Sequence, residues 1–313
     1  MTTAPISATA PGKVILFGEH AVVYGQPAIA APVMQVQATA TVEPSSDGSG
    51  LTIVATDLSK RITLEQAPQD EPLAVASRLT IDRLSAAEPD AILTVRSTIP
   101  IASGLGSGAA VSTALVRALA NYLGQPLQPG EISDLVYEVE RIHHGTPSGI
   151  DNTVVAYEEV VYFVREHPIT RLSVGEPFTL LVADTGKPSP TGEIVGRVRR
   201  TWKRERAHYD ALFDQIGDTA EEARDAIEAG AIDDIGPLMD SNHELLIELG
   251  VSSPVLDELV ETARLAGAIG AKLSGAGQGG NMIALVEDDD TGEQVAAALR
   301  EAGAARVILT EVR

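Results

Sequence analysis

The feature that most restricts the fold of this chain is a glycine-rich segment, Gly104-Leu105-Gly106-Ser107-Gly108, at a junction between two elements. Residues 91–97 before it are predicted as a strand, and an Ala-rich run that ends near Leu123 is predicted as a helix. A helix N-terminus offers unpaired N–H groups and a positive dipole end, and glycines let the backbone wrap an anion. The junction therefore suggests a phosphate-binding loop, although a tight turn without a ligand has the same pattern. It has neither the Gly-Lys-Ser/Thr of a Walker A loop nor the spacing of a dinucleotide-binding fingerprint.

The remaining pattern alternates strands and helices. Further strands are predicted at residues 14–17, 35–43, 51–55, 160–164, 178–183, 282–286 and 306–311, with 51–55 pairing back onto 35–43. Further helices are predicted at residues 73–84, 131–143 and 191–215. Another is predicted to begin after a cap at Ser253, and the last is predicted to begin with a capping box at 291–294 and to end at Gly303. A second glycine-rich loop is predicted at 272–281. We place a domain boundary near residue 177, which gives domains at 1–177 and 178–313.

Composition excludes several classes of protein. The 313 residues are 44% hydrophobic, which is enough for two cores, and the absence of cysteine excludes disulfides and thiolate chemistry. Residues 1–10 have no signal-peptide pattern, and no apolar run is long enough for a membrane helix, so a cytoplasmic protein is expected. The net charge of −21 repels phosphate backbones and argues against nucleic-acid binding.

One basic run departs from this acidic character. Its cations are Arg197, Arg199, Arg200, Lys203, Arg204 and Arg206. Such a run is usually a solvated helix face paired with nearby carboxylates, but it could also bind an anionic partner. The sequence leaves both interpretations open.

Two more motifs combine charged groups with apolar surroundings. In the first, Lys13, Glu19 and His20 interrupt an apolar strand and turn; charges in such places are costly unless they are paired or used. In the second, Glu140 lies late in a predicted helix and Asp151 follows a Pro/Gly turn. A carboxylate on a rigid turn can accept a hydroxyl proton, and a second carboxylate can hold Mg²⁺.

Taken in order, these motifs resemble those of the GHMP kinase family, named for galactokinase, homoserine kinase, mevalonate kinase and phosphomevalonate kinase. The resemblance extends from Ala10 to Asn281. The run Gly-Glu-His-Ala-Val from Gly18 differs from the Glu-His-Thr-Asp of galactokinases and is similar to that of members that phosphorylate the 5-hydroxyl of mevalonate in isoprenoid precursor synthesis. The implied fold is α+β, with a ribosomal protein S5 domain 2-like N-terminal domain and a ferredoxin-like C-terminal domain.

The resemblance also implies roles for particular residues. Asp151 would be the catalytic base, and Lys13 would lower the pKa of the attacking hydroxyl and neutralise charge at the γ-phosphate. Glu19, His20 and Thr191 would contact the substrate, whereas Glu140 and Ser107 would hold Mg²⁺. The residues implied to bind ATP are Ser97, Ala102, Ser103, Gly104, Leu105, Gly106, Ser107 and Gly108.

Two positions depart from the family pattern. Gly108 stands where the family loop has a second serine, whose hydroxyl commonly reaches the metal, and Gln278 stands where a glycine is usual. The implied partners are ATP, Mg²⁺ and a small alcohol, with no nucleic acid and no membrane; the oligomeric state is open, a homodimer included. The alternatives are another small-molecule kinase of the family, for phosphomevalonate or a different alcohol, and a non-catalytic metabolite-binding member.

Overall fold

The computed structural model describes residues 4–100, 104–144 and 147–313; the predicted loop residues Ala102 and Ser103 lie outside them. The strands are β1 (Ile6–Phe17), β2 (Ala28–Pro44), β3 (Leu51–Ala55), β4 (Lys60–Thr63), β5 (Ala91–Ser97), β6 (Val161–Phe163), β7 (Thr170–Arg171), β8 (Phe178–Asp184), β9 (Gly270–Ser274), β10 (Asn281–Val286) and β11 (Arg306–Val312). The α-helices are α1 (Pro72–Arg83), α2 (Ser107–Tyr122), α3 (Pro129–His144), α4 (Ile150–Tyr157), α5 (Thr191–Trp202), α6 (Arg206–Ala229), α7 (Ile232–Glu248), α8 (Pro254–Leu265) and α9 (Asp289–Glu301). A 3₁₀ turn, η1 (Ala21–Tyr24), follows β1.

The chain forms two compact units that are not contiguous in sequence. The first unit contains residues 1–12, 36–100 and 106–158, and the second contains 13–35, 101–105 and 159–313. The long strands β1 and β2 contribute residues to both. The division into domains at residue 177 therefore stays a prediction about the family architecture.

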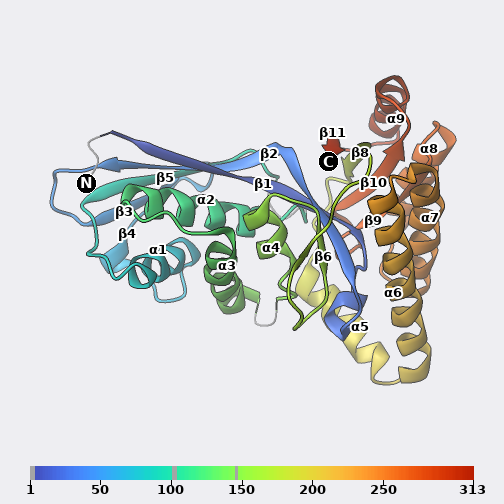
Figure 1. Cartoon of the computed structure of the whole chain (residues 1–313), viewed down its shortest axis with the longest axis horizontal. Coiled ribbons are helices and arrows are strands. Elements are labelled where there is room, and N and C mark those ends of the chain that lie inside the picture. Colours follow the sequence, from blue (N-terminus) through green and yellow to red (C-terminus); the bar gives the residue numbers. More distant parts are fainter. Residues whose placement is uncertain (1–3, 101–103, 145–146) are drawn as a thin grey trace. The chain divides into compact units, whose positions relative to one another are not determined.

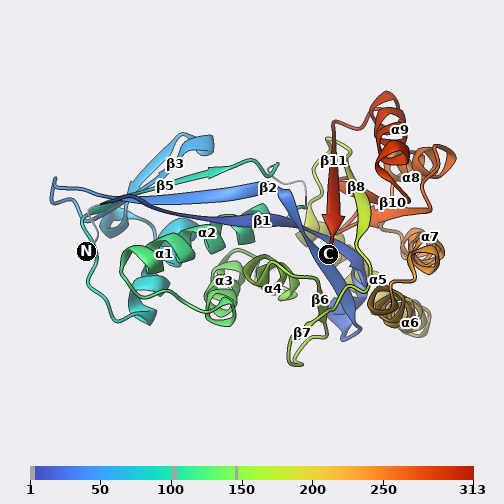
Figure 2. The same ribbon diagram turned by 45° about the horizontal axis from the view of Figure 1, so that its top comes forward.

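In the first unit, β3 pairs in parallel with β5 and antiparallel with β4. The predicted pairing of β3 with β2 is wrong, because β5 lies between these two strands and pairs with β2. Helix α1 connects β3 to β5 and so allows the parallel arrangement, which a tight turn cannot. Helices α1 to α4 pack against one another (Figures 1 and 2).

The second unit contains a four-stranded antiparallel sheet in the order β11-β8-β10-β9. Helices α7 and α8 contact β9, and α9 contacts β8, β10 and β11 (Figure 1). The core between these layers is almost entirely aliphatic, with fully buried residues such as Leu181, Leu273 and Leu299. This agrees with the low aromatic content of 4%.

Three helical regions differ from the predicted pattern. Residues 191–215 form two helices, because the Trp202 indole donates to Asp210 Oδ1 at 2.7 Å and turns the chain between α5 and α6. Helix α4 was not predicted; it begins after Gly149, which has φ 92°. The cap of α9 is Asp288, whose carboxylate accepts from the Thr291 N–H, rather than the predicted capping box.

The second glycine-rich loop is shorter than predicted. Lys272 to Ser274 belong to β9 and Asn281 begins β10, so the loop is confined to residues 275–280. Lys272 is thus a fully buried strand residue and not a loop residue.

Candidate active site

The N-terminus of α2, in the first unit, has the form that the sequence predicted for an anion site. The helix begins after Gly106, which has φ 71° and no side chain with which to cap it, and its first turn contains no acidic residue. The first intrahelical bond runs from Ala110 N–H to the Gly106 carbonyl at 2.9 Å. The preceding N–H groups of the first turn are therefore directed away from the helix body, where an anion can accept from them.

The glycine at position 108 determines how much space the first turn of α2 leaves for a ligand. Among the described residues, a Cβ added at Gly108 would meet no atom within 4 Å, so none of them fills the volume beside the first turn. Ser107 is half-buried at the first helical position. Ser97, also predicted to bind ATP, lies at the end of β5, where its Oγ accepts from Ile99 N–H at 3.1 Å.

Two carboxylates of the first unit lie on adjoining helices. Asp151 is in the first turn of α4 and Glu140 is in the last turn of α3, and both residues are half-buried. Asn152 holds the two helices together, since its Nδ2 donates to the Ser133 carbonyl at 3.1 Å and to Ser133 Oγ at 2.9 Å. The turn that carries Asp151 is therefore rigidly attached to α3.

In the second unit, the end of β1 is attached to the first glycine-rich loop and to β9. Lys13 N–H donates to the Leu105 carbonyl at 3.0 Å, which links this strand to the loop before α2. Two residues later, Ser274 Oγ accepts from Ile15 N–H at 3.0 Å and donates to the Ile15 carbonyl at 2.9 Å. The backbone of Lys13 is thus held on both sides.

The turn after β1 carries the other two predicted residues. Gly18 has φ 91°, and a Cβ there would lie 2.3 Å from the Pro27 carbonyl oxygen, so only glycine fits. His20 has φ 62°, which is uncommon for a residue with a side chain. Its Nε2 lies 2.9 Å from the Ala276 carbonyl; because a carbonyl only accepts, Nε2 carries the proton. Burial lowers the pKa of His20 to about 4, so the ring is neutral at physiological pH.

Thr191 begins α5 and is exposed. The segment before it is braced by the 275–280 loop, because Ser189 Oγ donates to the Gly277 carbonyl at 2.7 Å and Gly280 N–H donates to the Lys187 carbonyl at 2.9 Å. The 275–280 loop therefore contacts both His20 and the segment that precedes Thr191.

Sequence reasoning missed the partner of Glu19. Lys272 Nζ forms an ion pair with Glu19 Oε1, and both side chains have no exposed surface. The sequence does contain a signal for one member of this pair. Lys272 is the single charged residue in the run Gly-Ala-Lys-Leu-Ser, and such a run is typical of a buried strand. The glycines that follow Lys272 favour a loop from residue 272, and this prediction is wrong because Lys272 belongs to β9.

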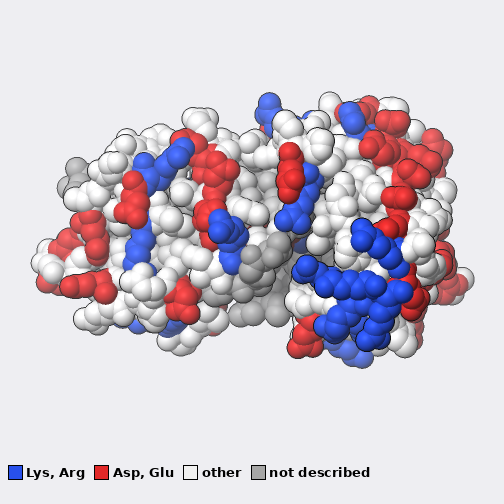
Figure 3. Space-filling model, turned by 90° about the horizontal axis from the view of Figure 1, so that it is seen from below, with Lys and Arg blue, Asp and Glu red and all other residues white. Residues whose placement is uncertain are grey.

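The basic run lies on α5 and the start of α6, where blue side chains gather at the lower right of Figure 3. Within the described residues, Arg206 pairs with Asp210 at 3.4 Å, whereas Arg199, Arg200 and Lys203 are exposed and have no ion pair. The interpretation as a face neutralised by neighbouring carboxylates therefore holds for only part of the run.

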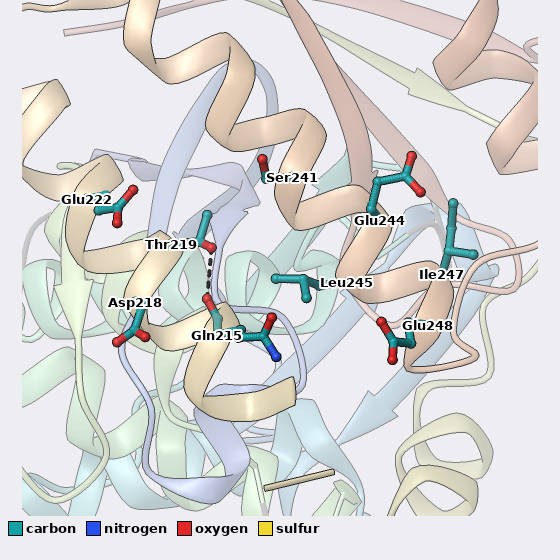
Figure 4. Close-up of a pocket in the computed structure, with 9 residues that line it drawn as sticks. All are labelled: Gln215, Asp218, Thr219, Glu222, Ser241, Glu244, Leu245, Ile247 and Glu248. Carbon is teal, nitrogen blue, oxygen red and sulfur yellow. Dashed lines mark hydrogen bonds between the residues drawn. The ribbon is translucent and has the colours of Figure 1, made fainter. Parts of the chain in front are cut away.

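A separate groove of about 600 Å³ lies between α6 and α7, shown in Figure 4. Its lining residues are Gln215, Asp218, Thr219, Glu222, Ser241, Glu244, Leu245, Ile247 and Glu248. It contains none of the predicted site residues, and its carboxylates repel the anions that a kinase binds. We therefore do not assign the active site to it.

The described ranges contain no group of three or more His, Cys, Asp or Glu side chains placed to hold a metal ion. In the same ranges, no helix is both long and apolar enough to cross a membrane.

The comparisons with known proteins agree with this geometry. Residues 73–159 match the GHMP kinases N terminal domain, and residues 223–305 match the GHMP kinases C terminal domain. The chain belongs to the GHMP kinase family and has its α+β fold, as the sequence motifs predicted.

Within the family, the relatives that match along almost the whole chain are mevalonate kinases. That of Thermococcus sibiricus is 35% identical over 97% of this chain and 95% of its own length, and that of Pyrococcus furiosus is 34% identical over 98% and 96%. The crystal structure of L. major mevalonate kinase in complex with R-mevalonate superposes with a TM-score of 0.85 at 28% identity, over 100% of this chain and 96% of that one.

Proposed function

We propose that this protein is an ATP-dependent mevalonate kinase, which converts mevalonate and ATP into 5-phosphomevalonate and ADP for isoprenoid precursor synthesis. The observation that carries the proposal is the full-length similarity to mevalonate kinases, at 35% identity over 97% of the chain. Several of the predicted site residues add to it, because Lys13, Ser107 and Asp151 lie in regular strands or helices.

The first unit supplies the groups for ATP and for the proton. The N–H groups at the start of α2 donate to the phosphate oxygens, since the helix dipole and the small Gly108 favour a bound anion there. Asp151 takes the proton of the substrate's 5-hydroxyl. The oxygen of that hydroxyl bonds to the γ-phosphorus while the bond between the γ-phosphorus and the ADP oxygen breaks.

The second unit supplies the groups for the alcohol and for the developing charge. Lys13 stabilises the negative charge on the transferring phosphoryl group, while His20 and Thr191 contact the alcohol. The neutral His20 ring, protonated at Nε2, offers Nδ1 as an acceptor for a substrate hydroxyl. That Lys13 and Asp151 act on one phosphoryl group stays a prediction.

Mg²⁺ fits the donor set of the first unit. It prefers oxygen ligands and is usually held by one or two carboxylates together with substrate phosphates, so Glu140 and Ser107 are the residues that would hold it. When bound, it would neutralise charge on the phosphates. Cytoplasmic location and a homodimeric assembly also stay predictions.

Replacing Asp151 by Asn tests the chemistry. The variant should bind ATP as wild type does, whereas turnover should fall by about 10³-fold, because the proton acceptor is lost. Lys13→Met should also greatly reduce turnover. Nucleotide affinity from calorimetry and turnover from ADP release would be compared, and near-normal turnover of either variant would remove that residue from the mechanism.

The substrate itself is tested with wild-type protein and a panel of alcohols. The exposed cations of α5, the helix that begins with Thr191, make a phosphorylated alcohol the alternative substrate. ADP release would be measured with mevalonate, 5-phosphomevalonate, homoserine and galactose. The proposal expects mevalonate to have the highest kcat/KM, and preference for 5-phosphomevalonate would select the alternative.

A further inference from the structure

Glu19 was predicted to contact the substrate, but its carboxylate lies inside the second unit. The residue is only 1% exposed, and its Oε1 is paired with Lys272, which is 0% exposed. Lys272 Nζ also donates to the Leu273 carbonyl at 2.7 Å, so the ammonium has a second acceptor. The Lys272 ammonium therefore already occupies the Glu19 oxygen that a substrate would have to contact.

A buried ion pair of this kind is a poor device for stability alone. Removing two charges from water is expensive, and apolar side chains of similar size often stabilise a core as well or better. Burial raises the pKa of the Glu19 carboxyl, with the Lys272 ammonium opposing the effect, which reflects that expense. What a charged pair adds is a fixed geometry between the two elements that carry it.

The elements joined here are the ones that hold the predicted site. Glu19 directly precedes His20, and Lys272 is two residues before Ser274, whose hydroxyl holds Ile15 on both its N–H and its carbonyl. His20 in turn donates to the Ala276 carbonyl in the following loop. The pair is therefore one of three cross-links between the end of β1 and the β9–loop segment.

The backbone at this point needs such support. His20 is held at φ 62°, a conformation that persists in a residue with a side chain only where its surroundings impose it. Backbone bonds hold the turn from within, since Val23 N–H donates to the His20 carbonyl at 3.1 Å, and the ion pair of Glu19, one residue before His20, anchors the turn to β9.

We propose that Glu19 and Lys272 form a positioning pair, which holds His20 and the strand end carrying Lys13 in their active arrangement, and that Glu19 does not contact the substrate. The proposal rests on the proposed kinase function for its kinetic test, but it also has a test without turnover. It predicts that Lys272, to which the sequence motifs assigned no role, matters as much for activity as Glu19 does.

The kinetic experiment is a double-mutant cycle with Glu19→Gln, Lys272→Met and the double variant, assayed with ATP and the alcohol that wild type phosphorylates best. Each single variant should lower kcat/KM for the alcohol by about 100-fold, the size expected when a reacting group is displaced by about 1 Å. The KM for ATP should stay within about twofold. The double variant should be no worse than either single one, because residues that act as a unit are not additive.

A direct contact of Glu19 with the substrate predicts a different pattern. Glu19→Gln would then impair the enzyme, whereas Lys272→Met would leave kcat/KM near wild type, and that result overturns the proposal. Since a single variant with an unpaired buried charge could unfold, the double variant, which leaves no charge unpaired, carries the test in that case. Normal kinetics in a folded double variant also overturns the proposal.

The second readout is independent of activity. In ¹⁵N-labelled protein, the His20 ring should remain neutral and protonated at Nε2 down to about pH 4 in wild type. In the double variant, we expect the ring to lose its contact with Ala276 and to titrate near the ordinary value of 6.5. An unchanged His20 signal overturns the proposal, even if no tested alcohol is phosphorylated.

A matched control is the partly buried pair of Lys60 and Glu71, at 2.8 Å in the first unit. Glu71→Gln removes an ion pair and weakens the cap of α1, since Glu71 also accepts from the Ala74 N–H at 2.7 Å. This variant should lower the melting temperature and leave kcat/KM and the His20 signal unchanged. The control therefore distinguishes the effect of lower protein stability from the effect of a displaced His20 and Lys13.

Discussion

Gln278 shows how a single residue can replace a glycine in this fold. Its φ is 58°, the left-handed region that explains why the family usually has glycine at this position. Its backbone N–H donates to the Val251 carbonyl at 2.9 Å and its side-chain amide donates to the Ser252 carbonyl. These bonds offset the strain of the left-handed conformation, which is of the order of 1 kcal/mol.

At Gly108 the replacement is the reverse, since a glycine stands where the family usually has a serine. No backbone conformation requires glycine at this position. Its φ lies outside the left-handed region, and a Cβ there would have open space. Only the missing hydroxyl separates it from the usual serine. Ser107, one residue earlier, is the hydroxyl that remains at this helix terminus.

Replacing Gly108 by Ser should therefore leave activity unchanged or raise it. The added side chain fits without movement, and removing a glycine from a helix should stabilise the protein by up to about 1 kcal/mol. Calorimetric affinity for Mg²⁺·ATP and the melting temperature would be measured together. A large loss of nucleotide affinity would mean that this position is not aligned with the family serine.

At the scale of elements, the outer edge of β9 shows how this sheet avoids an unpaired strand. Asp240 Oδ1 accepts from Ala271 N–H at 2.9 Å and His243 Nδ1 accepts from Leu273 N–H at 3.3 Å. Arg264 donates to the Ala271 carbonyl at 2.9 Å. Side chains of α7 and α8 therefore satisfy the edge that the sheet leaves open, which protects it from pairing with other chains.

His243 should make the stability of this element depend on pH. Burial lowers its pKa to about 3, and the Asp257 carboxylate, 3.5 Å from Nε2 and 42% exposed, is too solvated to offset this. The unfolded chain binds the proton near pH 6.5 and the folded chain near pH 3, so this contribution is complete above pH 6.5 and is lost as the pH falls toward 3.

Between pH 7.5 and pH 5, this single group should reduce the free energy of unfolding by about 2 kcal/mol. Urea unfolding of wild type and His243→Asn would be compared at both pH values, since Asn keeps an acceptor for Leu273 N–H but does not titrate. The variant should lose about 2 kcal/mol less than wild type. Equal losses in the two proteins would show that His243 is not buried in the neutral form.

At the scale of the whole molecule, the net charge of −21 repels the anions that a kinase of this family binds. The exposed cations Arg199, Arg200 and Lys203 on α5 are a local exception to that field. Arg197, on the same helix, is close enough to His20 to lower the pKa of that histidine, although less than burial does. The field of this helix therefore reaches a predicted substrate-binding residue.

Neutralising Arg199, Arg200 and Lys203 to Gln should lower kcat/KM for the anionic substrate by about tenfold at low salt while kcat stays unchanged, because steering acts on encounter. The effect should shrink as salt screens the charges. The control carries the same charge change at three other exposed arginines, Arg61, Arg96 and Arg300. If the two triple variants behave alike, net charge and not the helix sets the rate of encounter.

Several parts of the fold follow from local pattern alone. The strand 51–55 and the strand 91–97 were predicted with the bounds that the structure has, since turn residues and apolar runs mark them. The partner of 51–55 was wrong, because pairing depends on a crossover through α1 that no local signal encodes. The break between α5 and α6 was missed for a similar reason, since helical periodicity continues through both.

The sequence by itself determined the family and the residues that carry its motifs, because phosphate binding and proton transfer require particular side chains at particular spacings along the chain. Only the tertiary structure decided what Glu19 contacts, since its partner Lys272 lies 253 residues away in the chain. An ion pair between a turn and a strand so far apart in the sequence leaves no trace in local pattern. It exists because the core that buries both charges forces them together.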